Sequence, residues 1–463
     1  MRVRGKLGRW LVGAGTLALA GCFTPYGPAK APVVADVAVV QDFDAWLGEL
    51  LDVVVADAVG DAPAATVADA AQDVQLEPDV PSQDLPPGPD VAPAFDITST
   101  AIVAPVFPPD ACTDCGWSQM PDMDGPRQNF KAAWSGTDLY FWGGEWGTQC
   151  CNDLLATGAR WNPKSNLWTA LPQAPLYATI DSQVVWGGDR LYVYPRTMPG
   201  AQSSGPTPWS PSPAIAAMYF PDKDLWKPMP QSSTSPMHRN LAAAVVWTGT
   251  TLIVWGGQVE GDAPGGSYDP TADSWTPLPA APIPEGQFSQ FCERGWTGKR
   301  LFVWNHYLKV GMTWTPSSAT WAQITPPSPS DATFGNAAVG IPGGVFLTST
   351  ADDTTYLGWF WWEDGAIWQP VLRPTWLKPG LKTQTIWTGK YLFMWTGHGS
   401  THGVLYDPLA GSWQPTVDTP EPIERIGDAL ATSGSEVFLL GGMDGPGTYN
   451  VVHADAWRFK LPP

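Results

Sequence analysis

The sequence predicts an all-β domain built from seven copies of a four-stranded unit, preceded by an export signal and an acidic segment. Three observations support this organisation. Two short phrases, one apolar and one aromatic, recur in alternation over residues 112–463. The chain holds 27 Trp, 48 Gly and 49 Pro, a composition that favours short strands separated by frequent turns. Residues 1–21 have the layout of a signal peptide.

Charge and length indicate the signal peptide. Residues 1–9 carry four positive charges and no negative one, and residues 10–20 are mostly apolar. This apolar stretch is shorter than the ~20 residues that span a bilayer, and it ends in small residues before Cys22. We therefore expect the chain to be exported.

Residues 19–22, Leu-Ala-Gly-Cys, resemble the lipobox of bacterial lipoproteins. The resemblance implies that the chain is cut before Cys22 and acylated on its thiol, so that membrane lipid is its first partner. Phe23, in a position where Asp would imply retention in the inner membrane, implies the outer membrane. The protein would then face either the periplasm or the cell surface. The alternative is an ordinary secretory signal that happens to contain a cysteine.

The segment that follows, up to residue 111, is expected to be a disordered tether. After Cys22 it holds 15 Asp or Glu residues against Lys30 alone. Few large apolar side chains and strong self-repulsion disfavour a packed core. The whole chain has 25 basic against 44 acidic residues, so it lacks the basic surface that a nucleic-acid partner requires.

The first repeated phrase is a turn glycine followed by about five apolar residues of high β-propensity, and often by Gly-Gly. It predicts a turn, a buried strand and a second turn. Stretches of small residues precede the copies, as in NLAAAVVW at residues 240–247, and they suit an innermost strand crowded near an axis. The seven copies are WSGTDLYFWGG (134–144), WGGDRLYVYP (186–195), WTGTTLIVWGG (247–257), WTGKRLFVWN (296–305), GIPGGVFLTS (340–349), WTGKYLFMWTG (387–397) and TSGSEVFLLGG (432–442).

The second phrase is an aromatic residue followed seven residues later by Trp. In five of six copies Pro stands two residues after the aromatic, which places a turn between the two members and each member on one of two antiparallel strands. With the small-residue and apolar strands, this makes four strands per unit. The pairs are Trp161/Trp168, Tyr219/Trp226, Tyr268/Trp275, Trp314/Trp321, Trp361/Trp368 and Tyr406/Trp413.

Residues 252–275 resemble a kelch repeat, in which an apolar strand ends in Gly-Gly and is followed by Tyr-Asp and then by Trp six residues after the Asp. Seven such units, about 50 residues apart, extend the resemblance over residues 112–463. Kelch domains are β-propellers. The resemblance therefore implies a seven-bladed propeller of four-stranded antiparallel blades around a channel.

The two ends of the domain complement each other. The last unit has Trp457 at the aromatic position but no Trp strand after it. Conversely, CGWSQMP at residues 115–121 is a Trp strand with no unit before it. We therefore expect Trp117 to complete the seventh blade beside Trp457, which closes the ring and leaves no open edge.

Arg127, Arg239 and Arg425 each lie nine or ten residues before a turn glycine, so we expect them at one level near one mouth of the channel. Kelch repeats often have Arg at this position. A converging set of guanidinium groups can bind a carboxylate through forked hydrogen bonds, which makes these residues ligand-binding candidates. The alternative, which we favour, is that each Arg holds the loops of its own blade.

Trp146, Trp209 and Trp376 fall outside the repeated phrases, in predicted loops. An exposed indole there can stack on a sugar or a peptide, so these residues are also ligand-binding candidates. Packing of the loops on the blades is the alternative, and we favour it.

Four cysteines are disulfide candidates. Cys112 and Cys115 flank the closing strand, and Cys150 and Cys151 lie in a loop of the first blade. Exported chains meet an oxidising compartment, so we expect one or two bonds between these pairs that latch the ring. A redox-type bond within Cys112-Thr-Asp-Cys115 and a four-cysteine zinc site are alternatives, although no predicted helix would lower the pKa of a thiol there.

No catalytic site stands out in the sequence. His398 and His402 have the spacing of metal ligands, but no third ligand lies nearby, so neither metal nor cofactor is expected. The sequence favours a membrane-anchored binding module that presents one propeller face to a protein, peptide or glycan. The alternative is a carbohydrate-active kelch enzyme, similar to a sialic-acid mutarotase or, with less support, to copper-dependent galactose oxidase.

Overall fold

The computed structural model describes the following residues, apart from the side chains of 239–240, 258–259 and 292: 115–147, 153–180, 182–194, 216–231, 236, 239–240, 244–256, 258–259, 265–283, 292–305, 308–327, 338–349, 355–374, 377, 384–395, 403–416, 422–423, 425–444 and 451–463. The expected signal peptide, Cys22 and the tether lie outside these ranges. Within them, no helix combines the length and apolar character of a membrane-spanning one.

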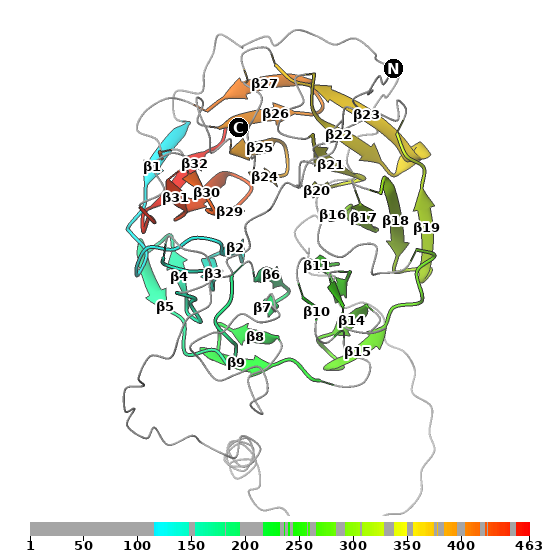
Figure 1. Cartoon of the computed structure of the whole chain (residues 1–463). Helices are drawn as coiled ribbons and strands as arrows, with labels where there is room; N and C mark the ends of the chain where they lie inside the picture. The colour runs from blue at the N-terminus through cyan, green and yellow to red at the C-terminus, as the bar shows by residue number, and fades with distance from the viewer. Residues whose placement is uncertain are drawn as a thin grey trace, which may run out of the picture. The chain divides into compact units, whose positions relative to one another are not determined.

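The described residues form a ring of seven four-stranded antiparallel sheets, the blades of a β-propeller (Figure 1). The predicted fold class is therefore confirmed. The strands nearest the centre are β2 (Lys131–Trp134), β6 (Gln183–Gly187), β11 (Ala244–Trp247), β16 (Cys292–Trp296), β20 (Ala338–Ile341), β24 (Gln384–Trp387) and β29 (Ala429–Thr432). The second strands are β3 (Leu139–Trp142), β7 (Arg190–Tyr194), β12 (Leu252–Trp255), β17 (Leu301–Asn305), β21 (Gly344–Thr348), β25 (Leu392–Trp395) and β30 (Glu436–Leu440).

The outer half of each blade carries the aromatic phrase. The third strands are β4 (Gly158–Asn162), β8 (Ala217–Phe220), β14 (Gly266–Asp269), β18 (Val310–Thr315), β22 (Tyr356–Trp362), β26 (Val404–Asp407) and β32 (Ala456–Lys460). The outermost strands are β5 (Leu167–Ala170), β9 (Leu225–Pro228), β15 (Ser274–Pro277), β19 (Thr320–Ile324), β23 (Ile367–Leu372), β27 (Ser412–Pro415) and β1 (Gly116–Gln119). A single 3-10 turn, η2 (Asp364–Ala366), is the helical element of the described residues.

The chain ends meet in the seventh blade. β1, from the start of the domain, is hydrogen-bonded antiparallel to β32, from its end. The register differs from the expectation: Trp117 lies opposite Phe459, and Trp457 lies opposite Gln119. Phe459 also lies opposite Val437 of β30, just as the aromatic residue of each other blade lies opposite a residue of its second strand. The aromatic position of the seventh blade is therefore held by Phe459, and the assignment to Trp457 is wrong.

The hydrophobic core is divided into seven clusters, each between two neighbouring blades. Between the seventh and first blades, for example, Phe438 of β30 packs with Phe141 of β3 and Trp161 of β4. Because the side chains of one strand alternate between the two faces of its sheet, every blade contributes to two clusters. The repeated apolar and aromatic phrases therefore build the scaffold.

Small residues allow the innermost strands of neighbouring blades to approach each other closely near the axis, as the sequence predicted. Gly295 of β16 and Gly340 of β20 lie in neighbouring blades, and a Cβ on Gly340 would collide with the backbone of Trp296. The inner strands of these two blades approach so closely that only glycine fits between them.

The turn inside the aromatic phrase has a repeated local structure. The residue five positions after the aromatic has positive φ, as at Asp273 (φ 49°), and Asp tolerates this region better than most residues. The hydroxyl of Tyr268 donates a hydrogen bond of 2.5 Å to Oδ1 of Asp273. Asp269 accepts hydrogen bonds from the N–H groups of Thr271 and Ala272. These acidic residues stabilise the turn, which accounts for their place in the repeat.

Candidate ligand-binding face

The two faces of the ring differ in the length of their connections. On one face, turns join first to second strands and third to fourth strands, and none exceeds four residues. On the other, connections such as residues 143–157 and 195–216 join second to third strands, and others join one blade to the next. We call this second side the long-loop face. Variable connections of this kind usually carry the specificity of a rigid scaffold.

The three tryptophans predicted as ligand contacts all belong to connections of the long-loop face. Trp146 lies between β3 and β4, Trp209 between β7 and β8, and Trp376 between β23 and β24. The placement of Trp209 and Trp376 is outside the described residues, so their roles stay predictions. Trp146 is 54% exposed and is the one aromatic among the exposed large apolar side chains of the described residues.

The backbone around Trp146 is held in place. Gln128 and Glu145 exchange two backbone hydrogen bonds, of 2.9 and 3.0 Å, and Nε2 of Gln128 donates to the carbonyl of Gly147 at 2.7 Å. The N–H of Trp146 donates to the carbonyl of Asp153 at 3.2 Å. The indole is thus exposed on a fixed backbone, which reduces the entropy lost when a ligand stacks on it.

The three predicted arginines occupy equivalent positions at the long-loop end of the first, third and seventh blades. Arg239 belongs to β10 (Arg239–Asn240), which pairs with β13 (Gln258–Val259), and Arg425 to β28 (Arg425–Ile426), which pairs with β31 (Met443–Asp444). In all three, the residue after Arg pairs with the residue after the Gly-Gly: Gln128 with Glu145, Asn240 with Gln258, and Ile426 with Met443. The side chain of Arg239 is outside the described residues.

Arg127 is 2% exposed, and its guanidinium contacts its own blade. Nη1 donates to the carbonyls of Gly143 (2.5 Å) and Thr157 (3.1 Å), and Nη2 donates to Oγ1 of Thr157 (3.1 Å). Asp124 forms an ion pair with Nη2 at 3.4 Å, and the ring of Phe141 lies 4.8 Å from the guanidinium carbon. Burial lowers the pKa of Arg127, although Asp124 acts in the opposite direction.

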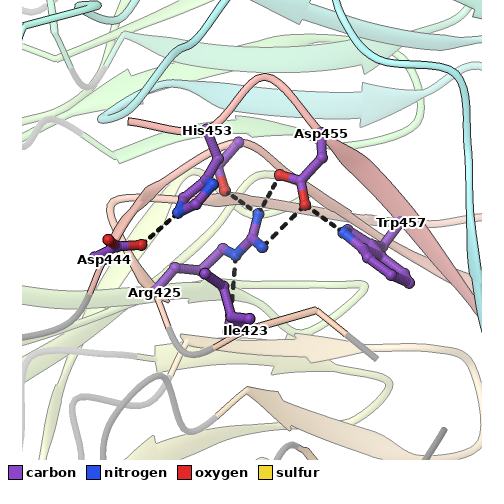
Figure 2. Close-up of polar contacts among 7 residues, drawn as sticks. Ile423, Arg425, Asp444, His453, Asp455 and Trp457 are labelled. Carbon is purple, nitrogen blue, oxygen red and sulfur yellow. Dashed lines mark hydrogen bonds and ion pairs between the residues drawn. The ribbon is translucent and has the colours of Figure 1, made fainter. Parts of the chain in front are cut away.

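Arg425 is held in the same way, with a stronger ion pair (Figure 2). Nη1 and Nη2 donate to the two carboxylate oxygens of Asp455 at 2.6 and 3.1 Å. Nη1 also donates to the carbonyl of Gly441 (2.9 Å), and Nε donates to that of Ile423 (3.1 Å). The indole of Trp457 donates to Oδ2 of Asp455 at 2.6 Å. Burial alone would raise the pKa of Asp455, but the bonds and charge of Arg425 outweigh it, so that pKa is lowered.

Arg127 and Arg425 therefore hold the loops of their own blades. This is the role that we favoured from the sequence over binding of a ligand carboxylate. Their forked N–H groups already have acceptors within the protein. A direct contact between these guanidinium groups and a ligand carboxylate stays a prediction.

Sequence reasoning missed a polar pair beside Arg425. Nε2 of His453 lies 2.5 Å from Oδ1 of Asp444 (Figure 2). Two backbone hydrogen bonds, from the N–H of His453 to Gly442 and from the N–H of Asp444 to Val451, fix the ends of the same connection. The two residues are nine positions apart across a loop, and no repeated phrase marks them.

Sequence reasoning also missed Asp428, directly before β29. It is 2% exposed, and neither carboxyl oxygen has a hydrogen-bond partner among the described residues. Its backbone carbonyl accepts a bond of 2.8 Å from Nε2 of Gln384 in the sixth blade. Burial raises the pKa of Asp428 to about 6, although its own backbone, the charges of Arg425 and Lys131 and the side chain of Gln384 act in the opposite direction. One signal in the sequence could have identified it. Asp428 stands three residues after Arg425, where the first copy has the apolar Phe130 three residues after Arg127.

The cysteine prediction is only partly within the described residues. Cys115, next to β1, is disulfide-bonded, and the cysteine that it bonds to lies outside the side chains that the structure describes. Cys112, Cys150 and Cys151 lie outside the described ranges, so the pairing stays a prediction. His398 and His402 lie outside them too. Among the described residues, no three His, Cys, Asp or Glu side chains gather as a metal site would require.

No protein-family model matches the sequence, and no curated protein matches it.

Proposed function

We propose that the protein is a kelch-type binding propeller, held at a bacterial outer membrane by lipid on Cys22, that binds a protein, peptide or glycan on its long-loop face. The asymmetry of the two faces is the observation that carries this proposal. Connections of at most four residues on one face leave little room for specificity, whereas the other face has the long connections and the exposed Trp146. Loops on a rigid scaffold are where binding residues concentrate.

The kelch assignment is supported by the phrase order, with Gly-Gly, Tyr-Asp and Trp in residues 256–275. The membrane anchor is supported by the residues around Cys22 alone. Mass spectrometry of the chain made in a Gram-negative host tests the anchor. We expect an acylated N-terminal Cys22, and a Cys22→Ser variant should carry no lipid. A wild-type chain without lipid would contradict the anchor.

Binding is tested with residues 23–463, carrying neither signal peptide nor lipid, on arrays of glycans and envelope peptides, followed by isothermal titration. Trp146→Ala should weaken binding of the selected ligand about tenfold or more, because exposed tryptophans on fixed backbone are frequent binding hot spots. The matched control is Leu409→Ala, because Leu409 is 59% exposed in a turn between β26 and β27 on the opposite face.

Loss of binding in Leu409→Ala with unchanged binding in Trp146→Ala would place the site on the opposite face and contradict the proposal. Turnover of the selected glycan by the purified chain would identify an enzyme instead.

A further inference from the structure

The seventh blade is tied to both of its neighbours at one place on the long-loop face. The N–H of Asn129 donates to the carbonyl of Gly427 at 2.6 Å, and the N–H of Gly442 donates to that of Arg127 at 2.7 Å. On the other side, Gln384 of the sixth blade donates to the backbone of Asp428. We call residues 127–129, 425–428 and 441–442, with Gln384, the closing joint. It joins the end of the domain to its beginning.

Asp428 is the ionisable group at the centre of this joint. Its Cβ lies so close to Gly442 that a Cβ on that glycine would be 3.0 Å away. The charged groups that act on its carboxyl are Arg425 of β28 and Lys131 of β2. The sixth blade faces it with the neutral Gln384.

Neither neighbouring cation neutralises the carboxyl at close range. The guanidinium of Arg425 is already paired with both oxygens of Asp455. Lys131 forms no ion pair among the described residues. Burial disfavours a carboxylate, and the opposing effects of Gln384 and of the Asp428 backbone do not outweigh it, so the closed joint binds a proton on Asp428 more tightly than an exposed aspartate does.

We propose that the closing joint is a proton-dependent device, in which the closed joint holds a proton on Asp428 under mildly acidic conditions and releases it to water when it opens. The proton is then the product of opening, so rising pH promotes opening by mass action. An open joint would free the loops that Arg127 and Arg425 hold, and with them the Trp146 connection. The pH would thus tune the order of the long-loop face.

The direction and size of the effect follow from linkage. In the closed joint the pKa of Asp428 is about 6, and in the open joint it returns to the ordinary value of ~3.9. A raised pKa stabilises the closed form at low pH, and that stabilisation is lost as pH rises through this interval. The opening constant should therefore rise about tenfold between pH 5 and pH 7 and change little above pH 7.

Hydrogen exchange of the mature chain, measured by mass spectrometry from pH 5 to pH 8 and corrected for intrinsic rates, tests the proposal. The reporters are the amides of Asn129 and Gly442, whose bonds cross the joint, and the reference is β12 in the third blade. In the wild type, protection of the reporters should fall about tenfold from pH 5 to pH 7 relative to the reference. In Asp428→Asn this fall should be absent.

Two further variants make the test decisive. Asp222→Asn changes an exposed acid in the turn between β8 and β9, and it should keep the wild-type pH dependence. Lys131→Met removes a cation that lowers the pKa of Asp428, so the fall in protection should move to higher pH. This variant tests the proposal even if Asp428→Asn does not fold. An unchanged pH dependence in Asp428→Asn, or no upward movement in Lys131→Met, would overturn it.

Discussion

At the scale of single residues, Arg425 shows how a side chain that resembles a ligand contact serves the scaffold instead. It is 1% exposed, and its N–H groups bond to two backbone carbonyls and a bidentate carboxylate. A buried ion pair adds little net stability when complete, but breaking it leaves one charge buried without its partner. The cost of removing Arg425 should therefore exceed that of any exposed arginine.

Arg425→Met should lower the free energy of unfolding by about 3–5 kcal/mol at pH 7, because Asp455 loses its partner. The lowered pKa of Asp455 stabilises the wild type above the ordinary pKa of Asp, and that contribution is lost as pH falls through its folded-state value. The difference between variant and wild type should accordingly shrink in acid. Urea unfolding at pH 7 and at about pH 2, below the ordinary pKa of Asp, measures both effects.

Arg300→Met is the control, in a turn of the opposite face, and it should change the free energy of unfolding by no more than about 0.5 kcal/mol. Equal effects of the two variants would show that the buried pair does not stabilise the blade.

At the scale of elements, the outermost strands hold neighbouring blades together through their tryptophans. The indole N–H donates to a backbone carbonyl just after the outermost strand of the preceding blade, with five examples: Trp168 to Pro121, Trp226 to Pro172, Trp275 to Pro230, Trp321 to Pro279 and Trp368 to Thr325. The Trp of the repeat is thus required for a hydrogen bond as well as for its apolar area. Phe would satisfy only the second requirement.

Trp275→Phe should lower the free energy of unfolding by about 1–2 kcal/mol, since it removes the 3.0 Å bond to Pro230 and some buried surface. Guanidinium unfolding followed by circular dichroism measures the change. Trp146→Phe is the matched control, because its indole is largely exposed. A Trp275→Phe chain as stable as wild type would mean that the inter-blade bond contributes nothing.

At the scale of the whole molecule, the ring is closed by four residues from the start of the domain. Trp117 of β1 is 4% exposed and contacts Phe393 and Trp395 of the sixth blade and Phe459 of its own. Without β1, the edge of β32 would be open to pairing with another chain. Closure therefore protects against aggregation as well as stabilising the last blade.

Trp117→Ala should lower the free energy of unfolding by about 3–5 kcal/mol, the usual cost of removing a large buried aromatic. It should also increase the fraction of aggregates on heating, because β1 detaches more easily. Calorimetry and light scattering measure the two effects, with Trp146→Ala as the exposed control. Unaltered melting and aggregation would show that β1 does not hold the ring shut.

The sequence by itself determined the all-β class, the number of blades and the strands that form them. Each depends on local patterns, such as the apolar phrase ending in Gly-Gly and the Tyr268/Trp275 spacing, because strand periodicity and turn chemistry act over a few residues. A closing Trp strand was likewise visible at residues 115–121. Its register was not: Phe459 rather than Trp457 faces Trp117, and pairing between chain ends depends on packing of the sixth and seventh blades.

Only the tertiary structure decided what the polar residues do. Arg425 and Asp455 are 30 residues apart, and the burial of Asp428 results from three blades meeting around it. The predicted ligand arginines had the right level in the ring, but the acceptors of Arg127 and Arg425 are backbone carbonyls, a hydroxyl and acids that no repeated phrase marks. Burial and partner choice depend on contacts between distant segments, so a local pattern can predict a residue's place in a blade without predicting its neighbours.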